Sequence, residues 1–333
     1  MKAFLLTAPN RLELRDIPMP VLKSTDVLIK VKMLGVCGTD VSVYKGQYAA
    51  KENVILGHEF CGEVAAVGAE VFTCKAGDFV ASAASSGCGK CRWCLEGKPS
   101  YCDNAQSLGR LVDGALAEYI AVDQRMIYHL LPGTSLAEGQ GLVGVSTALR
   151  AVKRAGVPMG GSVIVIGPGY SGLQIMQLMK MQGCHVTVVG TRKPRLDLAL
   201  SLGADAVANI RENPDWEGAV DNADCCIEAA GTLSSLQACM RKVKKGGVIV
   251  QFGTSRDAIA DIPQKDYYYK EITLVGSKGG YGCYEQALSL LGRHRVKVEP
   301  LVTHVFPFEK APEAFDMMDR RLDNVIRAAI RFD

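Results

Sequence analysis

The 333-residue sequence lacks a long apolar run, a tract of basic residues and any internal repeat. No segment approaches the ~18 apolar residues of a membrane-spanning helix, and the apolar stretch at the start is too short for a signal peptide. A formal net charge of +3 without a basic tract does not indicate nucleic acid or an anionic membrane as a partner. We therefore expect a globular protein that binds neither.

The composition, 48% hydrophobic and 22% charged, supplies apolar material for two cores, and the length suits about two domains. Twelve cysteines would indicate disulfides in a small secreted protein. In a large chain without a recognisable leader they fit a reducing compartment better. We therefore expect a cytoplasmic protein.

Four of the cysteines fall within fifteen residues, in the segment CGKCRWCLEGKPSYC; they are Cys88, Cys91, Cys94 and Cys102. Two C-x-x-C steps that share a cysteine, followed by a fourth thiol, can place four sulfurs around one tetrahedral ion. Four thiolates leave no coordination position open, so such a zinc orders a loop and does no chemistry. A disulfide pair or scattered buried thiols would not explain the close spacing beside glycines and a proline. The sequence thus predicts a structural zinc lobe at about residues 85–105.

The rhythm of apolar segments changes along the chain. Up to about residue 135 short strand-like segments are broken by Gly, Pro and Asp, which is typical of a β-rich unit. From about residue 160 apolar strands alternate with helices, which predicts a parallel sheet covered on both faces. The C-terminal stretch breaks this alternation and is expected to return to the first domain. The predicted fold class is α/β.

Gly167, Gly169 and Gly172 form G-x-G-x-x-G directly after the strand-like VIVI and directly before a helix pattern. Glycines permit a tight turn and a close backbone approach, and the helix N-terminus offers N–H groups to a pyrophosphate. A tight turn without a ligand is the alternative. The residues predicted to contact a dinucleotide here are Gly167, Gly169, Tyr170, Ser171 and Gly172.

The segment after the second strand of this unit indicates which dinucleotide is bound. Proteins that bind NAD usually place an acidic residue there for the ribose 2′-hydroxyl, but this chain reads Gly190-Thr191-Arg192-Lys193-Pro194-Arg195. Arg192 can bind a 2′-phosphate in a bidentate manner, with Thr191 and Arg195 beside it. We therefore expect NADP(H), with NAD(H) possible if the turn is merely a solvated basic one.

Two further motifs bring together ligand types that zinc accepts in open catalytic sites. Cys37 begins Cys-Gly-Thr-Asp, and His58 and Glu59 follow Gly57. Taken singly, Cys37 could be a core thiol and His58 a histidine with ordinary hydrogen-bond partners. Together with a four-cysteine loop and a dinucleotide motif, they predict a second, catalytic zinc.

With these motifs the chain resembles the zinc-dependent medium-chain alcohol and polyol dehydrogenase family over essentially its whole length. The matching segments are CGTD at 37–40, GHEF at 57–60, the cluster at 88–102, DGALAEY at 113–119 and GPGYSG at 167–172. The resemblance implies a GroES-like catalytic domain, a Rossmann domain and a C-terminal return to the former, with zinc in the cleft between the domains. The corresponding boundaries are 1–140, 141–277 and 278–333.

The resemblance also implies roles for individual residues. Cys37 and His58 would bind the catalytic zinc, Glu59 would be a direct or exchangeable ligand, Asp40 would orient His58, and Thr39 would relay the substrate proton. One position departs from the family, because Val143 stands where another ligand is common. The most economical interpretation is zinc on three side chains with water or substrate in the fourth position; weak or absent metal is the other.

The resemblance implies reversible oxidation of an alcohol by NADP(H), and GHEF with the YKGQY segment favours a secondary alcohol of a polyol, sugar or related hydroxy compound. Two rival hypotheses stay open. If the metal is loosely held because Val143 replaces a ligand, the chain would suit an NADPH-dependent reductase of a conjugated C=C bond or carbonyl. The second rival is a non-catalytic protein that binds zinc and a nucleotide and uses the cysteine lobe to associate with a partner. Members of the family imply a homodimer or homotetramer.

Overall fold

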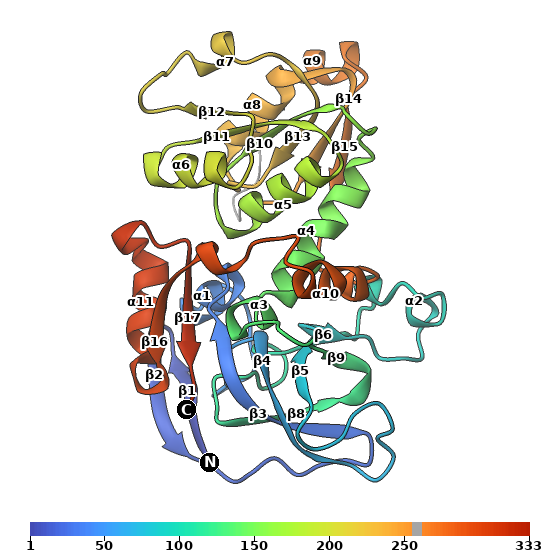
Figure 1. Cartoon of the computed structure of the whole chain (residues 1–333), viewed down its shortest axis with the longest axis vertical. Coiled ribbons are helices and arrows are strands. Elements are labelled where there is room, and N and C mark those ends of the chain that lie inside the picture. The colour runs from blue at the N-terminus through green and yellow to red at the C-terminus, as the bar shows by residue number, and fades with distance from the viewer. Residues whose placement is uncertain (255–261) are drawn as a thin grey trace. The chain divides into compact units, whose positions relative to one another are not determined.

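The computed structural model describes residues 1–254 and 262–333, which divide into two compact units (Figure 1). Unit 1 comprises Met1–Val143 and Tyr284–Asp333, and unit 2 comprises Gly144–Cys283. The second boundary therefore falls six residues later than the sequence suggested, at 283 rather than 277. The segment before it packs on the helix that begins unit 2: a side chain at Gly280 would lie 2.0 Å from Ser146 Oγ, and Arg150 Nη1 donates to the Tyr281 carbonyl at 3.0 Å.

Unit 1 is built on a mixed, largely antiparallel sheet in the order β16-β17-β3-β4-β5-β9, with β8 pairing β3 as well. In β3 alternate side chains, those of Val27, Ile29 and Val31, are fully buried, which is the period-two pattern of a strand with one face on the core. The strands are β3 (Asp26–Gly35), β4 (Glu59–Val67), β5 (Phe79–Ser82), β8 (Tyr119–Asp123), β9 (Ile127–His129), β16 (Val302–Pro307) and β17 (Arg327–Arg331).

The C-terminal strand β17 pairs antiparallel with β3, so the end of the chain belongs to the sheet of unit 1. A hairpin of β1 (Lys2–Ala8) and β2 (Arg11–Asp16) turns at Asn10, whose φ is 63°. The sequence analysis did not predict this hairpin. The smaller elements of unit 1 are α1 (Gly38–Tyr44), β6 (Ser85–Ser86), α2 (Arg92–Leu95), η1 (Pro99–Tyr101), β7 (Gln106–Ser107), η2 (Gln124–Met126), α3 (Leu136–Gly139), α10 (Tyr284–Gly292), η3 (Glu299–Leu301), η4 (Phe308–Lys310), α11 (Ala311–Arg320) and η5 (Leu322–Asn324).

Unit 2 contains a parallel six-stranded sheet in the order β12-β11-β10-β13-β14-β15. Its strands are β10 (Ser162–Ile166), β11 (His185–Gly190), β12 (Ala206–Asn209), β13 (Ala223–Glu228), β14 (Val243–Gln251) and β15 (Thr273–Gly276). Its helices are α4 (Leu142–Ala155), which starts at the end of unit 1, α5 (Tyr170–Met181), α6 (Lys193–Ser201), α7 (Trp216–Ala219), α8 (Leu233–Lys242) and α9 (Gln264–Tyr269).

The strand order reverses direction between β10 and β13, so α5 and α6 cover one face of the sheet and α8 the other (Figure 1). The central strands are apolar throughout because both faces are covered; in β10, Val163 to Ile166 are all buried. This confirms the predicted α/β class, with a β-rich unit and a doubly wound parallel sheet. Within the described residues, none of the helices combines the length and apolar character that crossing a bilayer requires.

Candidate metal centres and dinucleotide site

The fold brings Cys37, His58 and Glu59 together: one donor atom from each lies within 4.8 Å of the other two. Cys37 follows the end of β3 and precedes α1, while Glu59 begins β4. These strands are antiparallel neighbours, and their register sets Gly35 opposite Glu59. Two segments that are about twenty residues apart in sequence therefore deliver a thiol, an imidazole and a carboxylate to one point.

Asp40 fixes this arrangement from the first turn of α1. Its Oδ2 accepts from the Cys37 amide at 2.9 Å, and its Oδ1 accepts from the Gly57 amide at 3.2 Å and bonds His58 Nδ1 at 3.0 Å. Asp40 is buried, as is His58. Because Nδ1 is held by the carboxylate, Nε2 is the ring nitrogen left for a metal, as in the carboxylate–histidine pairs of zinc sites.

The same carboxylate dominates the electrostatics of the histidine. Burial by itself lowers the pKa of His58, but the charge and hydrogen bond of Asp40, aided by the Cys37 thiol, raise that pKa well above its usual value. A metal bound to Nε2 would therefore displace a proton from this ring, so its affinity would fall as the pH falls.

Glu59 has a partner that the sequence analysis missed. Arg327 Nη2 lies 2.8 Å from Glu59 Oε2, and both side chains are only 4% exposed. Arg327 Nη1 also donates to the Val36 carbonyl at 2.6 Å, directly before Cys37. Despite the short ion pair, Glu59 Oε2 accepts no hydrogen bond of normal geometry from a described residue. The only sequence signal was a cation inside the apolar strand NVIRAAIRF, and nothing local identified its partner.

The donor set fits zinc. A half-buried thiol, an imidazole with its other nitrogen fixed, and a buried carboxylate oxygen without a hydrogen bond are ligands of an open zinc site. Val143 is buried at the start of α4, and within the described residues the cluster has three potential ligands and no fourth. Thr39 lies exposed in the first turn of α1, next to Asp40.

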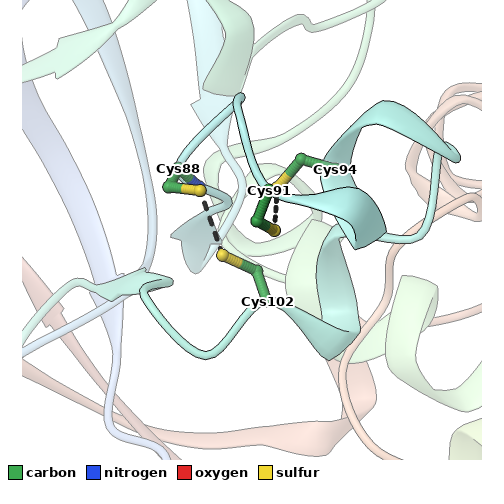
Figure 2. Close-up of side chains that lie close together, drawn as sticks. All are labelled: Cys88, Cys91, Cys94 and Cys102. Carbon is green, nitrogen blue, oxygen red and sulfur yellow. Dashed lines mark hydrogen bonds between the residues drawn. The ribbon is translucent and has the colours of Figure 1, made fainter.

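The four cysteines of the loop form the second cluster, in which the four Sγ atoms all lie within 4.8 Å of one another (Figure 2). Cys91 Sγ and Cys94 Sγ are 3.5 Å apart, and the Cys88 amide donates to Cys102 Sγ at 3.4 Å. The backbone N–H groups of Lys90 and Cys91 lower the pKa of Cys88 to about 6, so a thiolate forms readily there. All four thiols are free of disulfide bonds. This donor set fits a closed tetrahedral zinc site.

The glycine turn after β10 has the features that its sequence predicts for a dinucleotide. Gly167 has a φ of +108°, which a side chain would strain, and a Cβ on Gly172 would lie 2.1 Å from the Gly167 carbonyl oxygen. Gly169, at the N-cap of α5, is different: a Cβ there meets no atom of the described residues within 4 Å. Two glycines therefore serve the turn and its packing, and the third leaves open space above a helix N-terminus that begins with Tyr170 and Ser171.

A second feature of this edge of the sheet was not predicted. Glu228, fully buried at the end of β13, accepts from the amides of Ala230 at 2.9 Å and Gly231 at 2.8 Å and from Ser235 Oγ at 2.7 Å. It thereby fixes the loop that faces the glycine turn, because Gly167 packs directly on Ala229 and Ala230.

The end of β11 carries the basic turn. A Cβ on Gly190 would lie 2.5 Å from Pro168 Cγ, so this position packs against the glycine turn. Thr191 is exposed, while Arg192 and Arg195 are half-buried. Arg192 Nη1 is buried without a hydrogen-bond partner in the described residues, whereas Lys193 Nζ is occupied by Asp197 at 2.8 Å.

The cytoplasmic location and the homo-oligomeric state stay predictions.

Comparison with known proteins agrees with this architecture. Residues 23–132 match the alcohol dehydrogenase GroES-like domain, and residues 172–293 match the zinc-binding dehydrogenase family. A probable D-xylulose reductase A of Emericella nidulans is 33% identical over 330 residues, covering 94% of this chain and 92% of that protein. D-arabitol-phosphate dehydrogenase of Enterococcus avium is 30% identical, covering 95% and 94%.

Among solved structures, an alcohol dehydrogenase of Escherichia coli CFT073 in complex with NADH superposes with a TM-score of 0.92 at 27% identity, covering 100% of this chain and 99% of that one. The β-rich unit is thus the GroES-like domain and the parallel-sheet unit the Rossmann domain that the sequence predicted. Taken with the curated relatives, these similarities show that the chain is an enzyme, a member of the zinc-dependent medium-chain alcohol and polyol dehydrogenase family.

Proposed function

We propose that this enzyme interconverts a secondary alcohol of a polyol, sugar or related hydroxy compound with its carbonyl form, using NADP(H). The observation that carries the proposal is the cluster of half-buried Cys37 with buried His58 and Glu59, in which His58 Nδ1 is already held by Asp40. The substrate class is supported by the relatives, one named a D-xylulose reductase and one a D-arabitol-phosphate dehydrogenase.

In this proposal Cys37, His58 and Glu59 hold the catalytic zinc. When bound, zinc would act as a Lewis acid towards the substrate oxygen and the nicotinamide would accept or return the hydride. Asp40 keeps His58 in the tautomer that presents Nε2, and it holds the backbone on either side of the cluster. Arg327 compensates the charge of Glu59 whenever that carboxylate is not bound to metal. Thr39, exposed on α1, passes the substrate proton outward.

The second cluster has a structural role in the proposal. Cys88, Cys91, Cys94 and Cys102 hold a zinc that has no open position, and so they order the lobe without contact with the substrate. The enzyme would therefore contain two zinc ions per chain, one for each cluster.

The preference for NADP(H) rests on the basic turn after β11. No acidic side chain stands there to repel a 2′-phosphate, and Arg192 Nη1 is a buried donor without a hydrogen-bond partner in the described part of the chain. A phosphate oxygen would satisfy it, with Thr191 and Arg195 adjacent in the same turn. The dinucleotide's pyrophosphate would lie over Gly169, where the structure leaves room for it.

The test of the metal chemistry is Cys37→Ser, with Cys74→Ser as the matched control because Cys74 lies outside both clusters. We expect Cys37→Ser to lower the kcat for D-xylulose reduction and for a panel of polyols by at least about 10³-fold, because metal catalysis supplies several kcal/mol of the barrier. NADP⁺ affinity should be unchanged, and Cys74→Ser should behave as wild type. Retained turnover in Cys37→Ser would refute the proposal, and a chelator-insensitive reduction of a conjugated C=C bond would support the rival reductase.

The test of cofactor choice is Arg192→Gln, compared with Lys193→Gln, which removes the same charge from a side chain already paired with Asp197. We expect Arg192→Gln to weaken NADP⁺ about 10- to 100-fold and NAD⁺ hardly at all, since a charge-assisted phosphate contact contributes about 1.5–3 kcal/mol. Lys193→Gln should change the NADP⁺ dissociation constant less than about threefold. Equal loss of both dinucleotides in Arg192→Gln would contradict the NADP(H) assignment.

A further inference from the structure

The cysteine lobe has a positively charged neighbour that belongs to a different part of unit 1. Arg125 lies in η2, far along the chain from the loop at 88–102, yet a Cβ built on Gly89 would stand 2.9 Å from Arg125 Nη1. Gly89 is the first residue between Cys88 and Cys91, and its φ is +77°. Cys88 and Arg125 also line one and the same cavity. The guanidinium therefore covers the backbone of the first C-x-x-C step.

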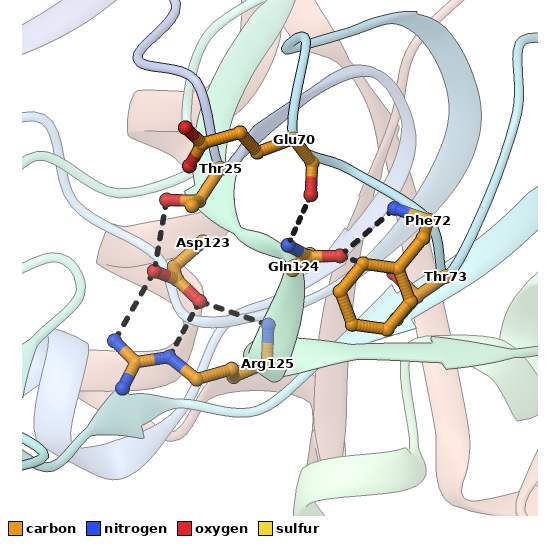
Figure 3. Close-up of polar contacts among 7 residues, drawn as sticks. All are labelled: Thr25, Glu70, Phe72, Thr73, Asp123, Gln124 and Arg125. Carbon is orange, nitrogen blue, oxygen red and sulfur yellow. Dashed lines mark hydrogen bonds and ion pairs between the residues drawn. The ribbon is translucent and has the colours of Figure 1, made fainter.

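The guanidinium is held in a defined orientation by Asp123 (Figure 3). Arg125 Nε donates to Asp123 Oδ1 at 2.8 Å and Nη2 donates to Oδ2 at 3.1 Å, a two-point contact. Asp123 is in turn fixed by the Arg125 amide at 2.9 Å and by Thr25 Oγ1 at 3.3 Å. This contact occupies two of the three guanidinium nitrogens and directs the remaining one, Nη1, to Gly89.

The short helix η2, which carries Arg125, is anchored to the loop between β4 and β5 of unit 1. Gln124 is buried, its Nε2 donates to the Glu70 carbonyl at 3.0 Å, and its Oε1 accepts from the Phe72 amide at 3.2 Å and from Thr73 Oγ1 at 3.3 Å (Figure 3). η2 is thus a fixed platform, and the position of the Arg125 side chain follows from it. The platform and the lobe are separate in sequence and meet at this guanidinium.

The chemistry of the lobe calls for such a cation. Four thiolates around Zn²⁺ leave a net charge of about −2 on the centre, and the lobe lies at the surface with only Cys102 buried. The hydrogen bond to Asp123 is the main cause that raises the pKa of Arg125, and the charge of Cys94 contributes as well. Of the three other cations of the lobe, Arg92 and Lys98 are committed to Glu96, at 2.6 and 3.2 Å, and Lys90 lies exposed between Cys88 and Cys91.

We propose that Arg125 is a positioning residue for the structural zinc. Its guanidinium, oriented by Asp123, stabilises the thiolate centre from outside and keeps the segment from Cys88 to Cys91 packed against η2. This proposal rests on the structural-zinc part of the proposed function. The side chain of Arg125 is 62% exposed, so the stabilisation is moderate and sensitive to salt.

The test measures zinc release from the full-length, zinc-loaded enzyme to excess 4-(2-pyridylazo)resorcinol. The kinetic phase of zinc release that belongs to the cysteine lobe is identified as the one that disappears in Cys88→Ser. We expect Arg125→Gln to accelerate this phase about three- to tenfold at low salt, in the range of a partly exposed outer contact. Arg125→Lys, which keeps the charge without the two-point contact, should lie between Arg125→Gln and wild type.

Arg92→Gln is the matched control, because it removes an identical charge from the lobe itself and should change the rate by less than about twofold. Raising NaCl from about 20 mM to about 0.5 M should narrow the gap between Arg125→Gln and wild type, because salt screens exposed charges. Equal rates in Arg125→Gln, Arg92→Gln and wild type would overturn the proposal. If Cys88→Ser leaves the zinc content unchanged, the structural zinc fails together with this proposal, whereas the catalytic centre stands.

Discussion

The two clusters of unit 1 reach similar ligand spacing by opposite routes. The four cysteines come from fifteen consecutive residues, lie near the surface and are held by a loop with two short elements, α2 and η1. Cys37, His58 and Glu59 come from the ends of two paired strands and are enclosed by Asp40 and Arg327. The first cluster is specified locally, and the second exists only when the sheet has formed.

This difference decides how much stability the protein loses when the metal of each cluster is absent. Three of the four lobe cysteines are only half-buried, so water can reach an empty lobe, which loses order without a large electrostatic penalty. The Glu59 side chain is only 4% exposed, so water hardly reaches it and it depends on a nearby cation, either Arg327 or a metal ion. The comparison therefore predicts large effects on stability from the buried cluster and its supports, and smaller effects from positions where the structure leaves room.

The largest effect is expected for Arg327→Leu, which leaves the Glu59 charge buried without its partner. Loss of one member of a buried ion pair costs about 3–5 kcal/mol of unfolding free energy, measured by urea titration of the metal-free protein. Added zinc should recover part of the loss, because a cation at Glu59 replaces the missing charge. Arg331→Leu, at an exposed position on the same strand, is the control and should cost less than about 0.5 kcal/mol. Equal stabilities of the two variants would show that the Glu59–Arg327 pair is not needed.

The sequence predicted more of the local features than of the distant ones, for a physical reason. The parallel sheet follows from apolar runs separated by helix patterns, and the glycine turn follows from residues within six positions of each other. Arg327 and Glu228 act through partners brought close only by strand pairing, and a single sequence contains no signal for that pairing. The hairpin of β1 and β2 was missed because its turn at Asn10 contains no glycine.

Asp40→Asn probes how far the buried cluster depends on its support. The amide keeps the shape, but its single oxygen can accept from only one of the Cys37 and Gly57 amides, which bond different oxygens of Asp40, and it removes the charge beside His58. We expect zinc at the buried cluster to bind about 10- to 100-fold more weakly, as for other supports of metal-bound histidines. Competition titration with a chelator of known affinity measures this.

Asp113→Asn is the control for that experiment, because Asp113 is a half-exposed carboxylate of unit 1 paired with Lys51. It should leave zinc affinity within about twofold of wild type. A wild-type zinc affinity in Asp40→Asn would mean that the carboxylate does not orient the histidine, and it would remove the main distinction between the cluster on the paired strands and the cysteine lobe.

The smallest effect on the fold is expected at Gly169, and its neighbour provides the contrast. Gly172→Ala places a methyl group 2.1 Å from the Gly167 carbonyl oxygen and should cost about 1–3 kcal/mol of stability. Gly169→Ala, at a φ of −86°, places its methyl group more than 4 Å from the rest of the described chain, so the unfolding free energy should change by less than about 1 kcal/mol. NADP⁺ affinity should nevertheless fall in Gly169→Ala, because the methyl group fills space reserved for the pyrophosphate. Thermal unfolding and NADP⁺ titration of both variants separate the two roles. Unchanged NADP⁺ affinity in Gly169→Ala would mean that the open space serves no ligand and that this turn is local architecture alone.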